Sequence, residues 1–180
     1  MGVVSPRAFD FVDDLRALRD PELVLLKGHV VLEQFLVAVV AARLNTVEDE
    51  VPGLKFGALV DLAFKNSEER KYLIWLNELR NVAAHKFNAL DSLQFSAVLQ
   101  RFDLPWPKGN LERCILLEQL LLRFIDLALL QMLEYMRSTP PDPGDDFDEE
   151  WFGEIEGESD AARKRIAERD ATLARIRHEE

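Results

Sequence analysis

Residues 21–44 read PELVLLKGHVVLEQFLVAVVAARL, and this stretch decides the fold class. Asp20 followed by Pro21 is a helix start signal, because aspartate caps free backbone amides and proline fits the first helical turn. The apolar residues that follow recur at helical spacing, at Leu25, Leu32, Leu36, Val39 and Val40. The sequence therefore predicts one long helix over residues 21–44.

Helical patterns cover most of the remaining chain. Further helices are predicted over residues 6–18, 55–64, 67–84, 92–101 and 111–136. Between them, Val51-Pro52-Gly53 and Pro105-Trp106-Pro107 break the pattern. Nowhere do turn residues separate two alternating runs, which is the pattern of a β-hairpin. We therefore expect an all-α helical bundle of about five to six helices.

The composition suits one domain followed by a tail. The chain has 180 residues, of which 48% are hydrophobic, so residues 1–137 can bury a core. Cys114 is the single cysteine and cannot form an internal disulfide, which fits a reducing cytoplasm. The first residues lack a signal-peptide pattern. No run is expected to span a membrane, because charged residues interrupt the most apolar segment, residues 115–136.

Residues 138–180 form a strongly acidic tail. They hold six basic and 14 acidic residues, which is −8 of the chain's net charge of −11. Residues 138–160 contain prolines and glycines but no basic residue, so we expect an acidic linker that is disordered or extended. Trp151 and Phe152 lie within it and are candidate docking residues for a partner, or they fold back onto the domain. Residues 161–180 form a charged segment with a narrow apolar stripe, which predicts a last helix. The whole tail is expected to be dispensable for folding.

Residues 79–85, LRNVAAH, carry the side chains with the most chemistry. The guanidinium of Arg80 can bind a phosphate through two hydrogen bonds. The imidazole of His85 can move a proton near neutral pH. An enzyme that cuts RNA without a metal needs both abilities.

Arg80-Asn81-x-x-x-His85 resembles the Arg-polar-x-x-x-His signature of the HEPN superfamily (higher eukaryote and prokaryote nucleotide-binding). Members are small helical domains, many of them ribonucleases of toxin–antitoxin and phage-defence systems. The resemblance implies a homodimer in which two motif helices pack side by side and line a shared cleft with both arginines and both histidines. It implies an RNA substrate, a cognate antitoxin or regulatory partner, and no cofactor.

In a catalytic site, His85 would take the proton from a ribose 2′-hydroxyl or give one to the leaving oxygen. Arg80 would hold the scissile phosphate, and Asn81 would orient the phosphate or the histidine. Further candidates for RNA binding or support are Asn77, Lys86 and Glu33.

A purely structural interpretation of the same residues is open. A histidine at a helix C-terminus can cap free carbonyls, and Arg80 can pair with Glu78 or with a carboxylate on another helix. Glu33 could pair with Arg80 or His85. Gly28 within a helix suggests close approach of another backbone. His29, His85 and Glu33 lack the spacing of a metal site, so we expect none.

Three functions follow from the sequence. The first is a metal-independent endoribonuclease. The second is a non-catalytic regulatory or protein-interaction module, because the order of helices also resembles the mannitol operon repressor family, which lacks the complete Arg-Asn-x-x-x-His string. The third is an acidic antitoxin or immunity protein, in which the acidic tail mimics phosphate.

Overall fold

The computed structural model describes residues 14–46, 48, 51, 53–85, 89–138 and 149–178, and this part of the chain contains helices and no strand. The predicted all-α helical bundle is confirmed. The α-helices are α2 (Pro21–Leu44), α3 (Phe56–Ala63), α4 (Glu69–His85), α5 (Leu93–Leu99), α6 (Asn110–Ser138) and α7 (Glu149–His178). Two 3-10 turns, η2 (Ala89–Asp91) and η3 (Gln100–Phe102), flank α5.

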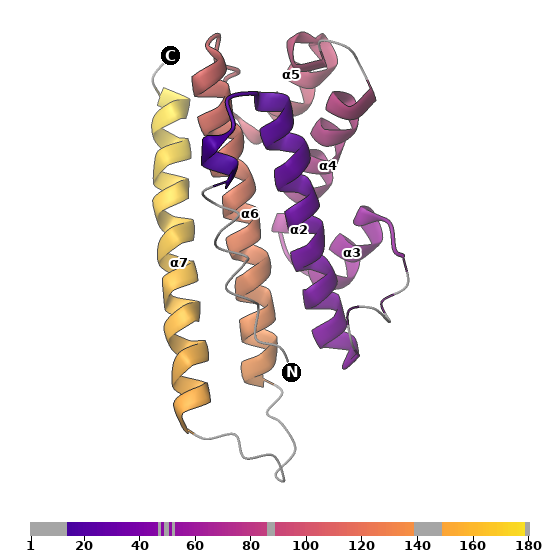
Figure 1. Ribbon diagram of the computed structural model, residues 1–180, viewed down its shortest axis with the longest axis vertical. Helices are drawn as coiled ribbons and strands as arrows, with labels where there is room; N and C mark the ends of the chain where they lie inside the picture. Colours follow the sequence, from indigo (N-terminus) through magenta and orange to yellow (C-terminus); the bar gives the residue numbers. More distant parts are fainter. Residues whose placement is uncertain are drawn as a thin grey trace.

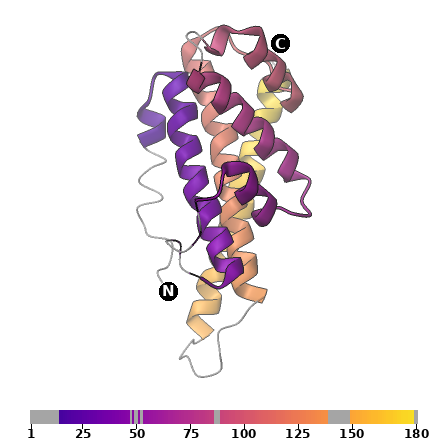
Figure 2. The same ribbon diagram turned by 90° about the vertical axis from the view of Figure 1, so that its right-hand side faces the viewer.

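The long helix α6 is the centre of the bundle. It packs against α2 on one side and against α7 on the other (Figure 1). The shorter helices α3 and α4 pack against α2 on the side away from α7, and α5 packs against α4 (Figures 1 and 2). The core is built mainly from leucine, valine and phenylalanine side chains of α2, α4 and α6.

Helix α2 begins and ends where the sequence predicts. The Asp20 side chain accepts hydrogen bonds from the backbone amides of Glu22 and Leu23, and Pro21 occupies the first turn. Asn45 ends the helix in the left-handed conformation, with φ 49°. Of the predicted first helix, residues 14–18 lie in the described part of the chain, and residues 14–17 are helical.

Helix α2 also corrects the expectation that no run could span a membrane. By length and composition alone, it is long and apolar enough to do so. However, 50% of its most apolar window is buried inside the protein, and a buried core helix meets the same criteria.

Gly28 marks a close contact between α2 and α6, but the neighbour is a side chain and not the predicted backbone. A Cβ atom built on Gly28 would lie 2.5 Å from Cδ1 of Leu121 on α6. Leu121 is itself fully buried, so it has little room to move. Glycine at this position therefore allows the two central helices to approach closely.

The expectation that residues 138–160 form a disordered or extended linker is corrected by α7. This helix begins at Glu149, so residues 149–160 are helical where a disordered or extended linker was predicted. It then continues through the helix predicted in residues 161–180. Trp151 and Phe152 belong to α7, but their side chains lie outside the described part of the structure, as does all of Lys86.

One stripe of α7 explains why it folds onto the domain. Its buried or half-buried residues recur every three or four positions: Ser159, Ala162, Ile166, Arg169, Leu173 and Ile176. Ala162 is completely buried, and Leu173 is 6% exposed. A stripe at this spacing suits packing against one neighbouring helix, which is α6.

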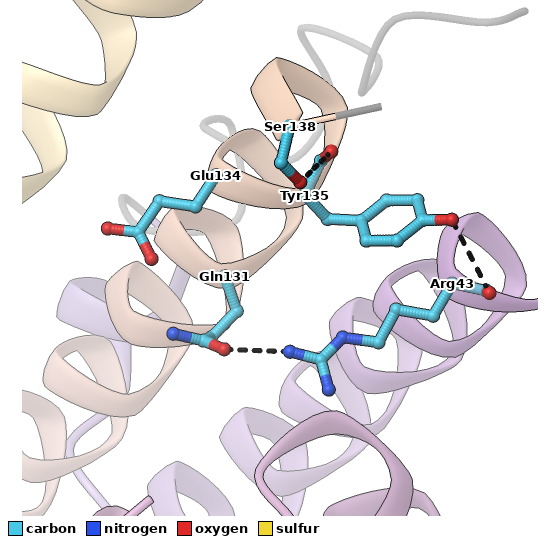
Figure 3. Close-up of a pocket in the computed structure, with 5 residues that line it drawn as sticks. All are labelled: Arg43, Gln131, Glu134, Tyr135 and Ser138. Carbon is cyan, nitrogen blue, oxygen red and sulfur yellow. Dashed lines mark hydrogen bonds between the residues drawn. The ribbon is translucent and has the colours of Figure 1, made fainter. Parts of the chain in front are cut away.

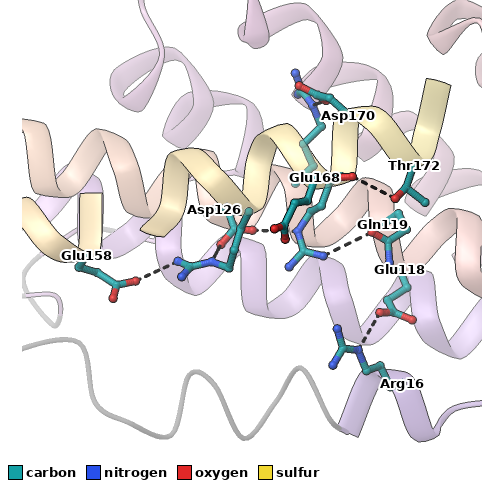
Figure 4. A network of polar contacts seen from close by, with 11 residues as sticks. Arg16, Glu118, Gln119, Asp126, Glu158, Glu168, Asp170 and Thr172 are labelled. Atoms are coloured by element: carbon teal, nitrogen blue, oxygen red, sulfur yellow. Dashed lines mark hydrogen bonds and ion pairs between the residues drawn. The ribbon is translucent and has the colours of Figure 1, made fainter. Parts of the chain in front are cut away.

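Charged groups reinforce the contact between α6 and α7. The carboxylate of Asp126 on α6 is buried and accepts hydrogen bonds from Arg165 at 2.7 Å and Arg169 at 2.8 Å (Figure 4). Arg123 of α6 pairs with Asp170 of α7 and also with Glu69 of α4 at 2.9 Å. Several basic residues of the tail pair with the domain in this way. The net charge of the tail therefore does not indicate whether the tail packs against the domain.

Candidate functional site

Helix α4 carries the motif on the part of its surface that is not buried in the core. The amide of Glu69 donates a hydrogen bond to the Ser67 hydroxyl at the start of the helix. Its apolar face is buried in the core through Leu73, Leu76, Leu79, Val82 and Ala83. The motif side chains lie outside this face: Asn77 and Arg80 are half-buried, while Asn81 and His85 are exposed.

Arg80 has no carboxylate partner within 4.0 Å among the described residues. Its Nη1 donates a hydrogen bond to Oδ1 of the neighbouring Asn81 at 3.1 Å. Glu78, the partner that a structural role would offer, instead pairs with Arg101 at 2.6 Å. Most other arginines in this part of the chain do pair with carboxylates. The guanidinium of Arg80 therefore retains donors that can bind an anion.

Glu33 does not supply the missing carboxylate. The sequence allowed it to pair with Arg80 or His85, but neither ion pair forms in the described structure. Glu33 lies half-buried on α2, one turn after His29, so helix geometry keeps it on the side of α2 that carries His29.

His29 is the neighbour of Arg80 that sequence reasoning missed. Its ring is only 2% exposed and packs against Phe56 of α3, with ring centroids 4.2 Å apart. Burial, and then the charge of Arg80, lower the pKa of His29 to about 4, although a hydrogen bond with the Asn77 side chain opposes this shift. The imidazole is therefore neutral at physiological pH. The sequence indicates His29 only as a weak candidate metal ligand, because its position near Arg80 depends on how α2 packs against α4.

His85 is separated from Arg80 within one chain. Helix α4 continues through His85, so the two residues lie about 140° apart around the helix axis. One chain thus exposes both side chains but directs them to different faces. A site that uses both needs a second chain or a change at the end of α4.

No metal-binding group emerges from the described residues. Among them, no three His, Cys, Asp or Glu side chains gather closely enough to hold a metal ion. His29 and His85 do not come together with Glu33 in such a group.

A separate open pocket lies between the C-terminal ends of α2 and α6. It has a volume of about 490 Å³ and is lined by Arg43, Gln131, Glu134, Tyr135 and Ser138 (Figure 3). The guanidinium of Arg43 is held by Gln131 Oε1 at 2.9 Å and by a backbone carbonyl of α3. None of the motif residues lines this pocket, so it is distinct from the Arg80 site.

Comparison with protein-family models, with curated proteins and with solved structures finds no match to the chain. The site is therefore interpreted from its own side chains. These are an arginine with available donors (Arg80), two amides (Asn77 and Asn81), a neutral buried imidazole (His29) and an exposed one (His85).

The buried His29 predicts a specific loss of stability in mild acid. In the unfolded chain the pKa of His29 is near its ordinary value of 6.5, while in the folded protein it is about 4. Because the unfolded state then binds the proton first, the free energy of unfolding falls as pH drops from about 6.5 to 4, by roughly 3 kcal/mol, and levels off below.

This loss is measured by urea unfolding at pH 7 and pH 4.5 for the wild type and for His29→Phe. The variant keeps an aromatic ring against Phe56 but cannot bind a proton, so the difference between the two proteins isolates His29 from the carboxylates. An identical pH dependence in both proteins would contradict the assignment of a depressed pKa.

Proposed function

We propose that this protein is a HEPN-like, metal-independent endoribonuclease that uses Arg80 and His85 in a cleft shared by two chains. The observation that carries the proposal is Arg80. Its guanidinium has no carboxylate partner in the described structure, and it lies beside the amides of Asn77 and Asn81. These groups suit the oxygens of a phosphodiester, which accept hydrogen bonds and carry the negative charge.

In the proposed reaction, His85 and Arg80 have different roles. His85 accepts the proton of the ribose 2′-hydroxyl as its oxygen attacks the adjacent phosphorus. The bond from phosphorus to the 5′-oxygen breaks, and this oxygen takes a proton from water, while His85 afterwards returns its proton to the solvent. Arg80 stabilises the charge on the phosphate oxygens in the transition state. The products are a 2′,3′-cyclic phosphate and a 5′-hydroxyl.

One geometric observation favours a second candidate. Because Arg80 and His85 face different sides of α4 within one chain, the protein could bind RNA or a protein partner without cutting. Such a regulatory module would require Arg80 for binding but would leave RNA intact. The two candidates therefore differ in the role of His85 and agree on Arg80.

Both candidate functions require Arg80 for binding, and an RNA-binding assay tests this shared requirement. Arg80→Ala is expected to weaken binding of a fluorescein-labelled single-stranded RNA by at least about tenfold, because hydrogen bonds from a charged donor are lost. Arg175→Ala is the matched control: it removes the same charge from an exposed arginine on α7, which donates only to Thr172 among the described residues. Its effect should be about twofold at most. Fluorescence anisotropy at one fixed salt concentration measures both. Equal effects of the two variants would show that binding reflects net charge alone.

The shared cleft predicts a homodimer. The separation of Arg80 and His85 around α4 means that one chain alone cannot direct both at one phosphate. Light scattering at micromolar concentration is expected to give twice the chain mass of 20.7 kDa. A strict monomer, with or without RNA, would contradict the catalytic proposal and favour the regulatory one.

A further inference from the structure

The open pocket between the C-terminal ends of α2 and α6 carries one side chain of each charge. Arg43 comes from α2 and Glu134 from α6, and Gln131, Tyr135 and Ser138 complete a polar lining (Figure 3). Its volume of about 490 Å³ is in the range of sites that bind small molecules. The RNA site proposed on α4 uses none of these residues, so the proposed function leaves this pocket without a role.

Arg43 is fixed in the pocket by neutral groups. Its Nη1 donates to the backbone oxygen of Leu62 at 2.8 Å, and its Nη2 donates to Oε1 of Gln131 at 2.9 Å. Neither acceptor carries a charge, and no carboxylate among the described residues lies within 4.0 Å of the guanidinium. The remaining N–H groups of Arg43 can therefore bind a carboxylate, which neutralises the charge and accepts two hydrogen bonds side by side.

Two neutral donors lie beside Arg43. The oxygen of the Gln131 amide faces the guanidinium, so its nitrogen lies on the opposite side of the amide, away from Arg43 (Figure 3). The hydroxyl of Tyr135 is 3.5 Å from the backbone oxygen of Arg43, which is the outer limit of a hydrogen bond. Both groups can therefore donate to an anionic group that Arg43 binds.

The other part of the pocket favours a positive charge. Oε1 of Glu134 pairs with the exposed Arg163 at 3.3 Å, while Oε2 has no partner in the described structure. The helices α2 and α6 end at Leu44 and Ser138, beside the pocket, and the C-terminal end of a helix carries a partial negative charge. An ammonium group of a ligand would thus find both an available carboxylate oxygen and a favourable field.

We propose that this pocket binds a small zwitterion of the α-amino acid class, with its carboxylate on Arg43 and its ammonium group on Glu134. A plain anion such as phosphate would be repelled by Glu134, and a plain amine would be repelled by Arg43. A ligand that carries both charges has a partner for each. The proposal goes beyond the proposed function and does not depend on it.

Three probes with related skeletons test the proposal on the wild-type protein. L-alanine carries both charged groups, propionate lacks the ammonium group, and ethylamine lacks the carboxylate. Each is titrated into the full nitrogen-15-labelled chain at constant ionic strength, and the amide signals of Arg43 and Tyr135 are followed by NMR. Alanine should shift these signals in a saturable way and bind at least about tenfold more tightly than either of the other probes. Equal binding of alanine and propionate, or no saturable shift with alanine, would overturn the proposal.

Variants assign the two charges of the ligand to the two side chains. Glu134→Gln changes an exposed residue and should weaken alanine binding at least about tenfold, while propionate binds as well as before or better. Arg43→Gln should abolish binding of both probes. Arg137→Gln is the control, because it removes a positive charge from the same end of α6 but does not line the pocket. Its effect should be about twofold at most.

The pattern of losses decides the outcome. If Glu134→Gln weakens alanine and propionate equally, or if Arg43→Gln binds alanine as the wild type does, the assignment is wrong. Far-UV circular dichroism checks that each variant is folded. Should Arg43→Gln fail to fold, Glu134→Gln and the three probes on the wild type still decide between a zwitterion site and no such site.

Discussion

Removal of α7 is expected to destroy the cooperative fold of this protein. A chain that ends at Ser138 loses the ion pairs of Asp126 with Arg165 and Arg169. It also exposes the apolar surface of α6 that α7 covers and removes the buried Leu173 and the half-buried Ile166 and Ile176. Complete burial of one such side chain contributes about 1.5–3 kcal/mol. The free energy of unfolding of a domain of this size is only about 5–15 kcal/mol. We therefore expect the truncated chain to lose most of it.

Thermal unfolding followed by circular dichroism checks this expectation, and point variants locate the cause. Asp126→Ala removes a buried carboxylate from Arg165 and Arg169, of which Arg165 keeps Glu158 and Arg169 keeps Gln119. It should lower the free energy of unfolding by about 3 kcal/mol. Arg163→Ala is the control, since its ion pairs with Glu134 and Asp160 are exposed and should contribute less than about 1 kcal/mol. A truncated chain that melts cooperatively within a few degrees of the full chain would contradict the packing of α7.

Cleavage of RNA is the second large effect. The protein is expected to cut single-stranded RNA in the presence of EDTA and to leave 2′,3′-cyclic phosphate ends. Arg80→Ala and His85→Ala should each reduce the rate by at least about 100-fold, because loss of a key electrostatic or proton-transfer group costs about 3 kcal/mol of transition-state stabilisation. Gel analysis of a 5′-labelled RNA measures the rate and the product ends.

Two controls accompany this assay. Arg175→Ala should cut RNA at nearly the wild-type rate, and the far-UV circular dichroism of both motif variants should match that of the wild type. Cleavage that stops in EDTA, or that persists in either motif variant, would contradict the mechanism. Binding without any cleavage would favour the regulatory alternative.

The helices were predictable because their signals are local. Asp20 and Pro21 start α2 through contacts with the next few residues, so the sequence alone placed it over residues 21–44. The other predicted helices agree with the structure to within about two residues at most of their ends. Each of these helices depends on the spacing of side chains within its own segment. This spacing is visible in the sequence.

The errors concern contacts between distant segments. Asp126 lies 39 residues before Arg165 and 43 residues before Arg169. The net charge of the tail could not predict ion pairs between segments so far apart in the sequence. The contact of His29 with Asn77 likewise depends on how α2 packs against α4. In contrast, Arg80 and His85 could be selected as candidates from their spacing alone, whereas the position of His29 near Arg80 could not.

Mixing two inactive variants tests the central claim, that Arg80 of one chain works with His85 of another. Arg80→Ala and His85→Ala chains are unfolded together, refolded and assayed for RNA cleavage in EDTA. If dimers form at random, half of them contain one chain of each kind, and each of these has one intact Arg80–His85 pair out of two. The account predicts recovery of about a quarter of the wild-type activity. Mixed dimers that remain as inactive as either variant would contradict it.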